Sequence, residues 1–287
     1  MQIVANIIFL STFYVSFAVG LALIFGVMRI INFAHGELFM LGGYALWLIL
    51  ALTQGWFPQG LGFFVALIVA ALVVGLLGAL VQLTIFRRLR DHPFSIFMAT
   101  LGLSYVLQVL VVKAIGPMSQ SIPAVFSGII QFAGIVLPIQ RLVVVAFTLS
   151  MIAGLWFFLM RTKTGRAVRA AAQNKTGAVL QGISMRRIGL ITMFIGSALA
   201  ALSGVLMGSV QGISPFMGGE AIWRAFIIII VGGIGSVSGS VVAALLFGTL
   251  DTLLTTFGLG KLVAMVDAVI MLMILSFMPN GLLGKRE

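Results

Sequence analysis

The sequence contains no cysteine and few charged residues. Without cysteine the chain has no disulfide framework, no thiolate metal site and no cysteine nucleophile. Asp, Glu, Lys and Arg together make up 8% of the 287 residues, whereas soluble domains typically contain about 25%. With 61% hydrophobic residues and a mean hydropathy of +1.24, the chain lacks the polar groups that would cover a soluble globule. The composition therefore predicts an integral membrane protein.

Motifs of catalysis and nucleotide binding are also missing. The chain has no Gly-x-x-x-x-Gly-Lys-Ser/Thr phosphate loop, and no Ser/His/Asp set stands out. A metal site is a poor choice, because no second cluster adds ligands to His35 and Glu37. We therefore expect a chain that is no enzyme and holds no cofactor, so that any ATP chemistry must come from another chain.

Acidic residues are the scarcer charges, six against seventeen Lys and Arg, which gives a formal net charge of +11. In a soluble protein this excess would suggest nucleic acid, but here the basic residues lie in short loops beside apolar segments. Orientation in the lipid bilayer explains the charge, so we expect no nucleic-acid partner. The loop 161–187 has no acidic residue and contains seven basic ones, namely Arg161, Lys163, Arg166, Arg169, Lys175, Arg186 and Arg187. Because Lys and Arg near membrane spans stay on the cytoplasmic side, we expect this loop inside the cell.

Apolar stretches long enough to cross a bilayer follow one another along the chain. A bilayer core of about 30 Å requires roughly 20 helical residues. Seven clear candidates are 3–27, 37–53, 61–86, 94–115, 140–160, 188–212 and 262–279. A less regular apolar region at 222–250 adds one crossing or two. The predicted fold class is therefore an all-α integral membrane protein with about eight transmembrane helices, in which 1–287 form a single transmembrane domain.

The region 222–250 is interrupted by Gly232, Gly233, Gly235 and Gly239. Glycine and serine are common where membrane helices break or cross closely, so we expect two half-helices or a tight crossing here. Whether this region crosses once or twice decides on which side of the membrane the basic residues of the tail, Lys285 and Arg286, lie. Both counts, eight and nine helices, stay open.

The connection between the first two apolar stretches combines Asn32, Phe33, His35 and Glu37. Polar side chains at membrane depth are tolerated where they line a cavity or satisfy a broken helix, which favours a role in a conduit. The alternative is structural. Asn32 would then cap the following helix, Glu37 would lie near its positive end, and the turn would sit at the membrane surface.

The basic loop reads Thr-Gly-Arg-Ala-Val-Arg-Ala-Ala-Ala-Gln-Asn from Thr164 to Asn174. Thr164 is a plausible N-cap, and the alanines favour helix. Arg166 and Ala170 share one face, and a second short segment follows from Thr176, so we expect two short cytoplasmic helices. Their smooth surface fits either a groove of a partner protein or an anionic lipid surface.

The remaining charges near the later spans are predicted to have no chemical role. Glu220 and Arg224 are four residues apart and can pair on a helix end. Asp251, Lys261 and Asp267 are expected at the membrane interface. Since these acids lie near segment ends, the pattern disfavours an ion-coupled carrier, which usually has ionisable groups within its spans.

The segment Gly26-Val-Met-Arg-Ile-Ile-Asn-Phe-Ala-His-Gly-Glu37 resembles the permease subunit of bacterial branched-chain amino-acid ABC importers, the LivH type. The resemblance continues in Gly165-Arg-Ala-Val-Arg-Ala170, in Ala178-Val-Leu-Gln-Gly-Ile183 and in Gly232-Gly-Ile-Gly-Ser-Val-Ser-Gly239. It therefore extends over most of the chain.

This resemblance implies an ABC importer permease fold in the bacterial inner membrane, with alternating access across it. The implied partners are two cytoplasmic ABC ATPases, a second homologous permease and a periplasmic substrate-binding protein. The residues implied in ATPase coupling are Gly165, Arg166, Arg169, Ala170, Ala178 and Gly182. Those expected in the translocation path or its hinge are Asn32, Phe33, His35, Glu37, Gly232, Gly233 and Gly235.

The resemblance favours branched-chain amino acids as substrates, moved into the cytoplasm at the expense of ATP hydrolysed by the partners. Urea and short amides form the alternative substrate class, because permeases for them look similar. A stand-alone channel or secondary carrier is the alternative from a different functional class.

Overall fold

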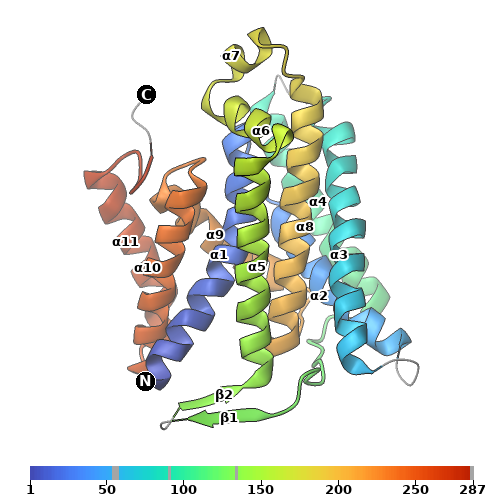
Figure 1. Ribbon diagram of the computed structural model, residues 1–287, viewed down its shortest axis with the longest axis vertical. Helices are drawn as coiled ribbons and strands as arrows, with labels where there is room; N and C mark the ends of the chain where they lie inside the picture. Colours follow the sequence, from blue (N-terminus) through green and yellow to red (C-terminus); the bar gives the residue numbers. More distant parts are fainter. Residues whose placement is uncertain (54–57, 90–91, 133–134, 285–287) are drawn as a thin grey trace.

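The computed structural model describes residues 1–53, 58–89, 92–132 and 135–284, and these are mostly helical (Figure 1). Within them, eight helical segments are long and apolar enough to cross a membrane. Six are the helices α1 (Gln2–Met28), α2 (His35–Leu52), α4 (Pro93–Ile115), α5 (Ile139–Arg161), α8 (Met185–Gln211) and α10 (Val237–Thr256). Two are composite: α3 (Gln59–Val81) continues into the π-helical turn η1 (Gln82–Phe86), and η2 (Gly260–Leu262) leads into α11 (Val263–Phe277). The predicted all-α membrane fold is confirmed.

The glycine-rich region is a broken helix, as expected. It forms α9 (Met217–Gly232) and α10, and the break includes Gly233 (φ 104°) and Gly235 (φ 81°), whose backbones are in conformations that other residues rarely adopt. The 16 residues of α9 span only about 24 Å, and α9 is not among the eight candidate spans. Three candidate spans, α8, α10 and η2–α11, and the shorter α9 make up the rest of the chain. Because α9 runs back between α8 and α10, the tail returns to the end of the molecule where the break lies, and the Leu282 N–H donates to the Val231 carbonyl there. Lys285 and Arg286 themselves lie outside the described residues.

The basic loop forms α6 (Lys163–Gln173) and α7 (Lys175–Leu180) at one end of the molecule, the upper end in Figure 1. The turn η1 lies near the same end, since a Cβ added at Gly189 in the first turns of α8 would contact the Gln82 side chain. The basic residues Arg87 and Arg88, which follow η1, therefore share this end with α6 and α7. Two basic segments thus lie at one end of the molecule, as expected if Lys and Arg near membrane spans stay on the cytoplasmic side.

The opposite end carries a short β-hairpin in the loop between α4 and α5. Strands β1 (Ile129–Phe132) and β2 (Ile135–Pro138) pair antiparallel, with Ile129 opposite Pro138. The N-terminus joins this end, because the Val136 backbone N–H donates to Gln2 Oε1 at 2.9 Å.

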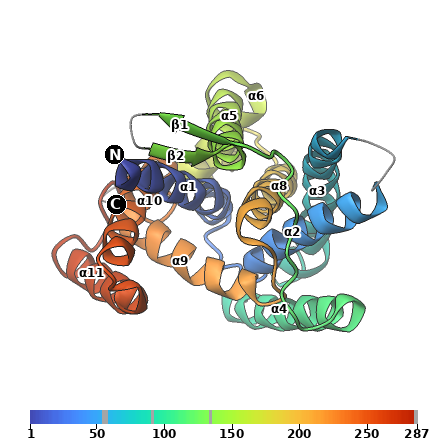
Figure 2. The same ribbon diagram turned by 90° about the horizontal axis from the view of Figure 1, so that it is seen from below.

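Two groups of helices, α1–α3 and α8–α10, are built alike and run in opposite directions. The helices α1 and α8 have 27 residues each, and each is followed by a short connection and a shorter helix, α2 or α9. The third helix of each group packs on the first helix of the other, α10 on α1 and α3 on α8 (Figure 2). The chain thus forms an inverted structural repeat, an arrangement that recurs among membrane transporters.

The two groups meet through backbone contacts at glycine. Gly20 of α1 faces Gly196 of α8, and Gly36 of α2 faces Gly218 of α9 so closely that a Cβ on either glycine would overlap the other's carbonyl group. Because lipid supplies no hydrophobic drive between helices, such close packing is a main source of their association.

Candidate translocation path and coupling surface

The connection between α1 and α2 enters the bundle. Gly20, where His35 is a close neighbour, lies eight residues before the end of α1, or about 12 Å along its axis. Asn32 and His35 have no exposed surface and Glu37 is 1% exposed. The alternative of a turn at the membrane surface is therefore wrong. Polar side chains from this connection instead lie inside the protein.

Asn32 does not cap α2. The N-cap residue is Ala34, and it makes no side-chain capping hydrogen bond. Both polar atoms of the Asn32 amide are buried, without a hydrogen-bond partner in the described part of the chain. An unsatisfied buried amide is costly, so Asn32 is an unusual residue at this place in the structure.

Glu37 joins three helices. One oxygen, Oε1, accepts hydrogen bonds from Ser104 Oγ at 2.9 Å and from Gln108 Nε2 at 3.0 Å, both on α4. The other, Oε2, points to the first turn of α9, where it would lie 2.9 Å from a Cβ on Gly218. The positive N-terminal end of α9 favours a negative charge at this place. Sequence reasoning missed Ser104 and Gln108, since both lie in a separate apolar span.

Phe33 and His35 pack among aromatic rings. The Phe33 ring centroid lies 4.9 Å from that of Phe226 on α9 and 5.1 Å from that of Phe97 on α4. The His35 ring lies 5.2 Å from Phe17 of α1. In the described ranges no group of three His, Cys, Asp or Glu is placed to hold a metal ion. The connection between α1 and α2 is thus the point where α1, α4 and α9 converge.

The glycines of the break connect α9, α10 and the tail. A Cβ on Gly232 would overlap Gly239 of α10, and one on Gly235 would lie 3.0 Å from Gly26 near the end of α1. The backbone N–H groups of Leu282 and Leu283 donate to the Val231 and Gly232 carbonyls at 2.8 and 3.1 Å. These glycines therefore lie in a tight junction near the α6–α7 end.

The helices α6 and α7 start at side-chain caps. The Thr162 hydroxyl accepts from the Gly165 N–H at 2.9 Å, and Asn174 Oδ1 accepts from the Gly177 N–H at 2.8 Å. The prediction of two short helices is confirmed, but the predicted cap Thr164 is wrong, because Thr164 lies inside the first turn of α6. Thr162 is the N-cap because the chain leaves α5 in the extended conformation there, which is typical of an N-cap residue.

The residues proposed for coupling divide into two groups. Gly165 and Ala178 are buried, and a Cβ on Gly165 would overlap the backbone of α5 at Phe158. Arg166 and Gly182 are exposed, whereas Arg169 and Ala170 are half-buried. The first group holds α6 and α7 on the body of the protein, and the second lies nearer the surface.

Two apolar side chains at the end of α7 lie beside this surface. Val179 is 53% exposed and Leu180 is 81% exposed, although both follow the buried Ala178. Large exposed apolar side chains on a basic segment are typical of a binding surface.

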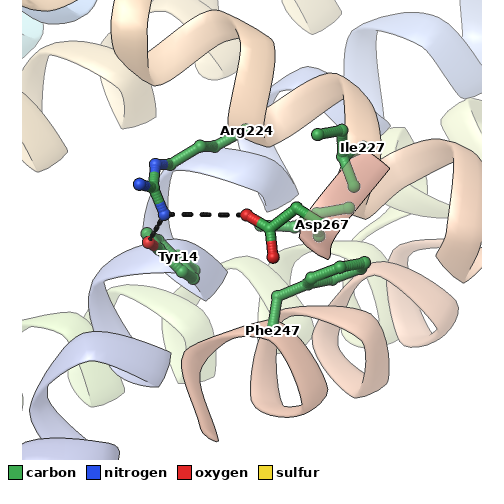
Figure 3. Close-up of a pocket in the computed structure, with 6 residues that line it drawn as sticks. Tyr14, Arg224, Ile227, Phe247 and Asp267 are labelled. Atoms are coloured by element: carbon green, nitrogen blue, oxygen red, sulfur yellow. Dashed lines mark hydrogen bonds and ion pairs between the residues drawn. The ribbon is translucent and has the colours of Figure 1, made fainter. Parts of the chain in front are cut away.

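A buried charge cluster was missed in the sequence. Arg224 on α9 forms an ion pair with Asp251 on α10, lies 3.9 Å from Asp267 on α11, and donates a hydrogen bond to the Tyr14 hydroxyl on α1. Figure 3 shows the guanidinium between Tyr14 and Asp267. The expected interfacial positions of the two aspartates are wrong, since Asp251 is 2% and Asp267 3% exposed.

Glu220 is not the partner of Arg224. It is exposed, and the described residues contain no ion pair between the two. Spacing along one helix favoured this pair, but the tertiary contacts of α9 with α10 and α11 put two carboxylates closer to the guanidinium. Lys261, by contrast, is exposed. The signal that pointed to the cluster was the position of Asp251 within an otherwise apolar stretch.

Comparison with known proteins gives a consistent result along the whole chain. The model of the family described as the permease component of branched-chain amino acid transport systems matches residues 3–278. The chain is 30% identical to LivH of Escherichia coli K12, described as a high-affinity branched-chain amino acid transport system permease protein, with 100% of this chain and 96% of LivH covered. BraD of Pseudomonas aeruginosa, described in the same words, is also 30% identical at the same coverage.

A more distant relative is LivM of Escherichia coli, also described as a permease of high-affinity branched-chain amino acid transport, which is 25% identical over 96% of this chain and 68% of its own length. No solved structure matches the chain. The eight apolar spans and the match over nearly the full length agree. This multi-pass membrane protein belongs to the family of permease components of branched-chain amino acid transport systems.

Proposed function

We propose that the chain is the permease subunit of an ATP-driven importer that moves branched-chain amino acids into the cytoplasm. Its family, and the descriptions of LivH and BraD, support this substrate class. The observation that carries the proposal is the full-length match, which covers the spans together with the basic segment between them. The chain would supply the passage and leave ATP hydrolysis to its partners.

The proposed assembly contains a second homologous permease, two cytoplasmic ATPases and a periplasmic substrate-binding protein, in the bacterial inner membrane. The similarity to both LivH and LivM supports pairing of two related permeases. The ATPase would bind α6 and α7, where Arg166, Val179, Leu180 and Gly182 offer an exposed, basic and partly apolar surface.

The coupling residues would then act in two ways. Gly165 and Ala178 fix α6 and α7 against the membrane helices, so that a movement of the ATPase reaches α5 and α8. Arg166, Arg169, Ala170 and Gly182 form or support the surface that is moved. Gly182 has a positive φ of 77°, which suits a turn between α7 and α8 that transmits this movement.

The passage would alternate between outward and inward openings near the connection between α1 and α2. Asn32, Phe33, His35 and Glu37 lie where α1, α2, α4 and α9 converge, and the unsatisfied Asn32 amide is available for new hydrogen bonds. The glycines of the α9–α10 break, including Gly233 and Gly235, would form the hinge. An element that starts inside the bundle can change its contacts without carrying a whole span along.

Purification of the tagged chain from its own host in mild detergent, followed by mass spectrometry, tests the assembly. We expect two ATPase chains and a second permease to co-purify. The charge reversal Arg166→Glu should remove the ATPases but leave the second permease. A chain that purifies alone and still supports uptake would instead favour a stand-alone carrier.

Substrate class is tested separately with the binding protein encoded beside these genes. We expect leucine, isoleucine or valine to raise its thermal unfolding temperature, and uptake of the same amino acids to require the permease. If urea, but none of the amino acids, raised this unfolding temperature, the chain would instead belong with the permeases for urea and short amides.

A further inference from the structure

The cluster around Arg224 brings side chains from four helices together in the protein interior. Arg224 donates to Asp251 Oδ2 and to the Tyr14 hydroxyl, and Tyr14 also donates to Asp251 Oδ2. Asp267 lies 3.9 Å from the same guanidinium nitrogen, Nη1. Both carboxyl groups thus approach one cation. Tyr14, Asp251 and Asp267 are 6%, 2% and 3% exposed.

The charges of this cluster do not balance if both carboxyl groups are ionised. Arg224 contributes one positive charge, whereas Asp251 and Asp267 would contribute two negative ones, and the Tyr14 hydroxyl is neutral. Both carboxyl groups are buried, although the Arg224 side chain is 38% exposed, so an uncompensated negative charge on them is costly. Two carboxylates sharing one site also oppose the second ionisation.

No other charged group in the described part of the chain compensates this excess. The elements packed around Asp267 are α9, α10 and η2, with α1 completing the cluster through Tyr14. The further charges on these elements are Glu220 on α9 and Lys261 on η2, and both are exposed. The remaining neighbours, such as Ile227 and Phe247, are apolar (Figure 3).

Each of the two aspartates keeps one oxygen, Oδ1, that is buried without a hydrogen-bond donor. A carboxylate there would have an unsatisfied acceptor, whereas a protonated carboxyl group turns one such oxygen into a donor. A bound metal cation is a poorer solution, because the Arg224 guanidinium pairs with Asp251, lies 3.9 Å from Asp267 and would repel it.

We propose that Asp251 and Asp267 bind one proton between them. The cluster is then neutral, with one guanidinium, one carboxylate and one carboxylic acid, and it fastens α11 to α9, α10 and α1. This matters for α11 in particular, because only 11% of its span is buried and few other contacts hold it. The inference concerns the permease chain itself and does not depend on its substrate.

Infrared spectroscopy of the purified full-length chain tests the shared proton. The parent should show, at neutral pH, the C=O stretching band of a protonated carboxyl group, shifted in heavy water. The band should be lost in Asp267→Asn and in Asp251→Asn, since each variant leaves one carboxylate matched by Arg224. It should be unchanged in the control Glu220→Gln, which removes an exposed carboxylate from the same helix as Arg224.

Two outcomes overturn the proposal: a parent without the band, and a band that survives both aspartate substitutions. In the second case Glu37→Gln identifies the other buried acid as its source. If Asp251→Asn does not fold, Asp267→Asn, which keeps the Arg224–Asp251 ion pair, decides the test alone, and a band that survives it overturns the proposal.

Thermal unfolding gives a second readout. If the folded state holds a proton that the unfolded chain releases at neutral pH, the unfolding temperature must fall as the pH rises through the range in which the pair ionises. In Asp267→Asn this part of the pH dependence should vanish, while in Glu220→Gln it should remain. Added sodium ions should leave this pH dependence unchanged, because they do not take the place of the proton. An Asp267→Asn curve parallel to that of the parent contradicts the proposal.

Discussion

The groups α1–α3 and α8–α10 share a scaffold but differ in how each fastens its outer helix. In the first group Glu37, at the start of α2, binds α4 through Ser104 and Gln108. In the second group the acid near the start of α9, Glu220, is exposed, and Arg224 one turn later binds α10 and α11 instead. The glycine contacts between the groups are common to both, whereas the polar fastenings are not.

Close backbone packing and buried polar groups therefore have different structural roles in this molecule. Backbone contacts at glycine define the inverted scaffold, and buried polar groups attach the outer helices α4 and α11, of which only 17% and 11% are buried. Both attachments involve α9, because Glu37 Oε2 lies at its first turn and Arg224 lies in its middle. The short helix α9 is therefore the element that connects the two attachments.

Breaking the shared scaffold should have the largest effect. In Gly204→Ala on α8 the new Cβ would overlap the Phe39 carbonyl oxygen of α2, where the backbone cannot move aside. We expect a loss of at least about 3 kcal/mol or no folded protein at all, measured by size-exclusion chromatography and thermal unfolding in detergent.

The matched control is Gly102→Ala on α4, where nothing lies within 4 Å of the added Cβ. This variant should fold as well as the parent or slightly better, because alanine favours helix over glycine. Equal stability of the two alanine variants would show that the close helix crossing does not determine the scaffold.

Removing the cation of the second group should cost somewhat less. In Arg224→Leu, Asp251 loses its ion pair in a buried site, and breaking such a pair typically costs about 3 kcal/mol or more. Because the Arg224 side chain is itself 38% exposed, we expect the lower end of this range. Thermal unfolding measures the loss, and Glu220→Gln on the same helix should leave stability unchanged. An Arg224→Leu variant as stable as the parent would show that Arg224 does not attach α10 and α11.

The corresponding change in the first group is Gln108→Leu. It removes one donor to the Glu37 carboxylate, and a hydrogen bond to a charged group contributes about 1.5–3 kcal/mol. We expect weaker attachment of α4, seen as faster limited proteolysis of the loop between α4 and α5 and as a lower unfolding temperature. The control Tyr105→Phe changes an exposed neighbour on α4 and should have no effect. If Gln108→Leu lost as much stability as Arg224→Leu, the two polar attachments would be equally strong, which would contradict the difference between the two groups.

The sequence predicts local features of this molecule better than contacts between distant helices. Apolar length identifies the spans, and Gly233 and Gly235 identify the break, because both signals are contained in one continuous segment. The partner of Arg224 could not be found in this way, since Asp251 and Asp267 lie on other helices and Glu220 has the favourable spacing within α9. In the same way Asn32 looked like a cap, although the chain enters the bundle before α2 begins at His35.

The smallest predicted effect concerns the segment that joins the two groups. Thr162 and Thr164 are equally suited by residue type to start α6, but only the Thr162 hydroxyl accepts the Gly165 N–H. Thr162→Ala should therefore cost about 1 kcal/mol of local stability, whereas Thr164→Ala should cost less, because alanine is the better residue inside a helix. Hydrogen exchange of the α6 amides measures both variants in the folded protein. Faster exchange in Thr164→Ala than in Thr162→Ala would show that Thr164 is the N-cap and that α6 starts farther from the end of α5.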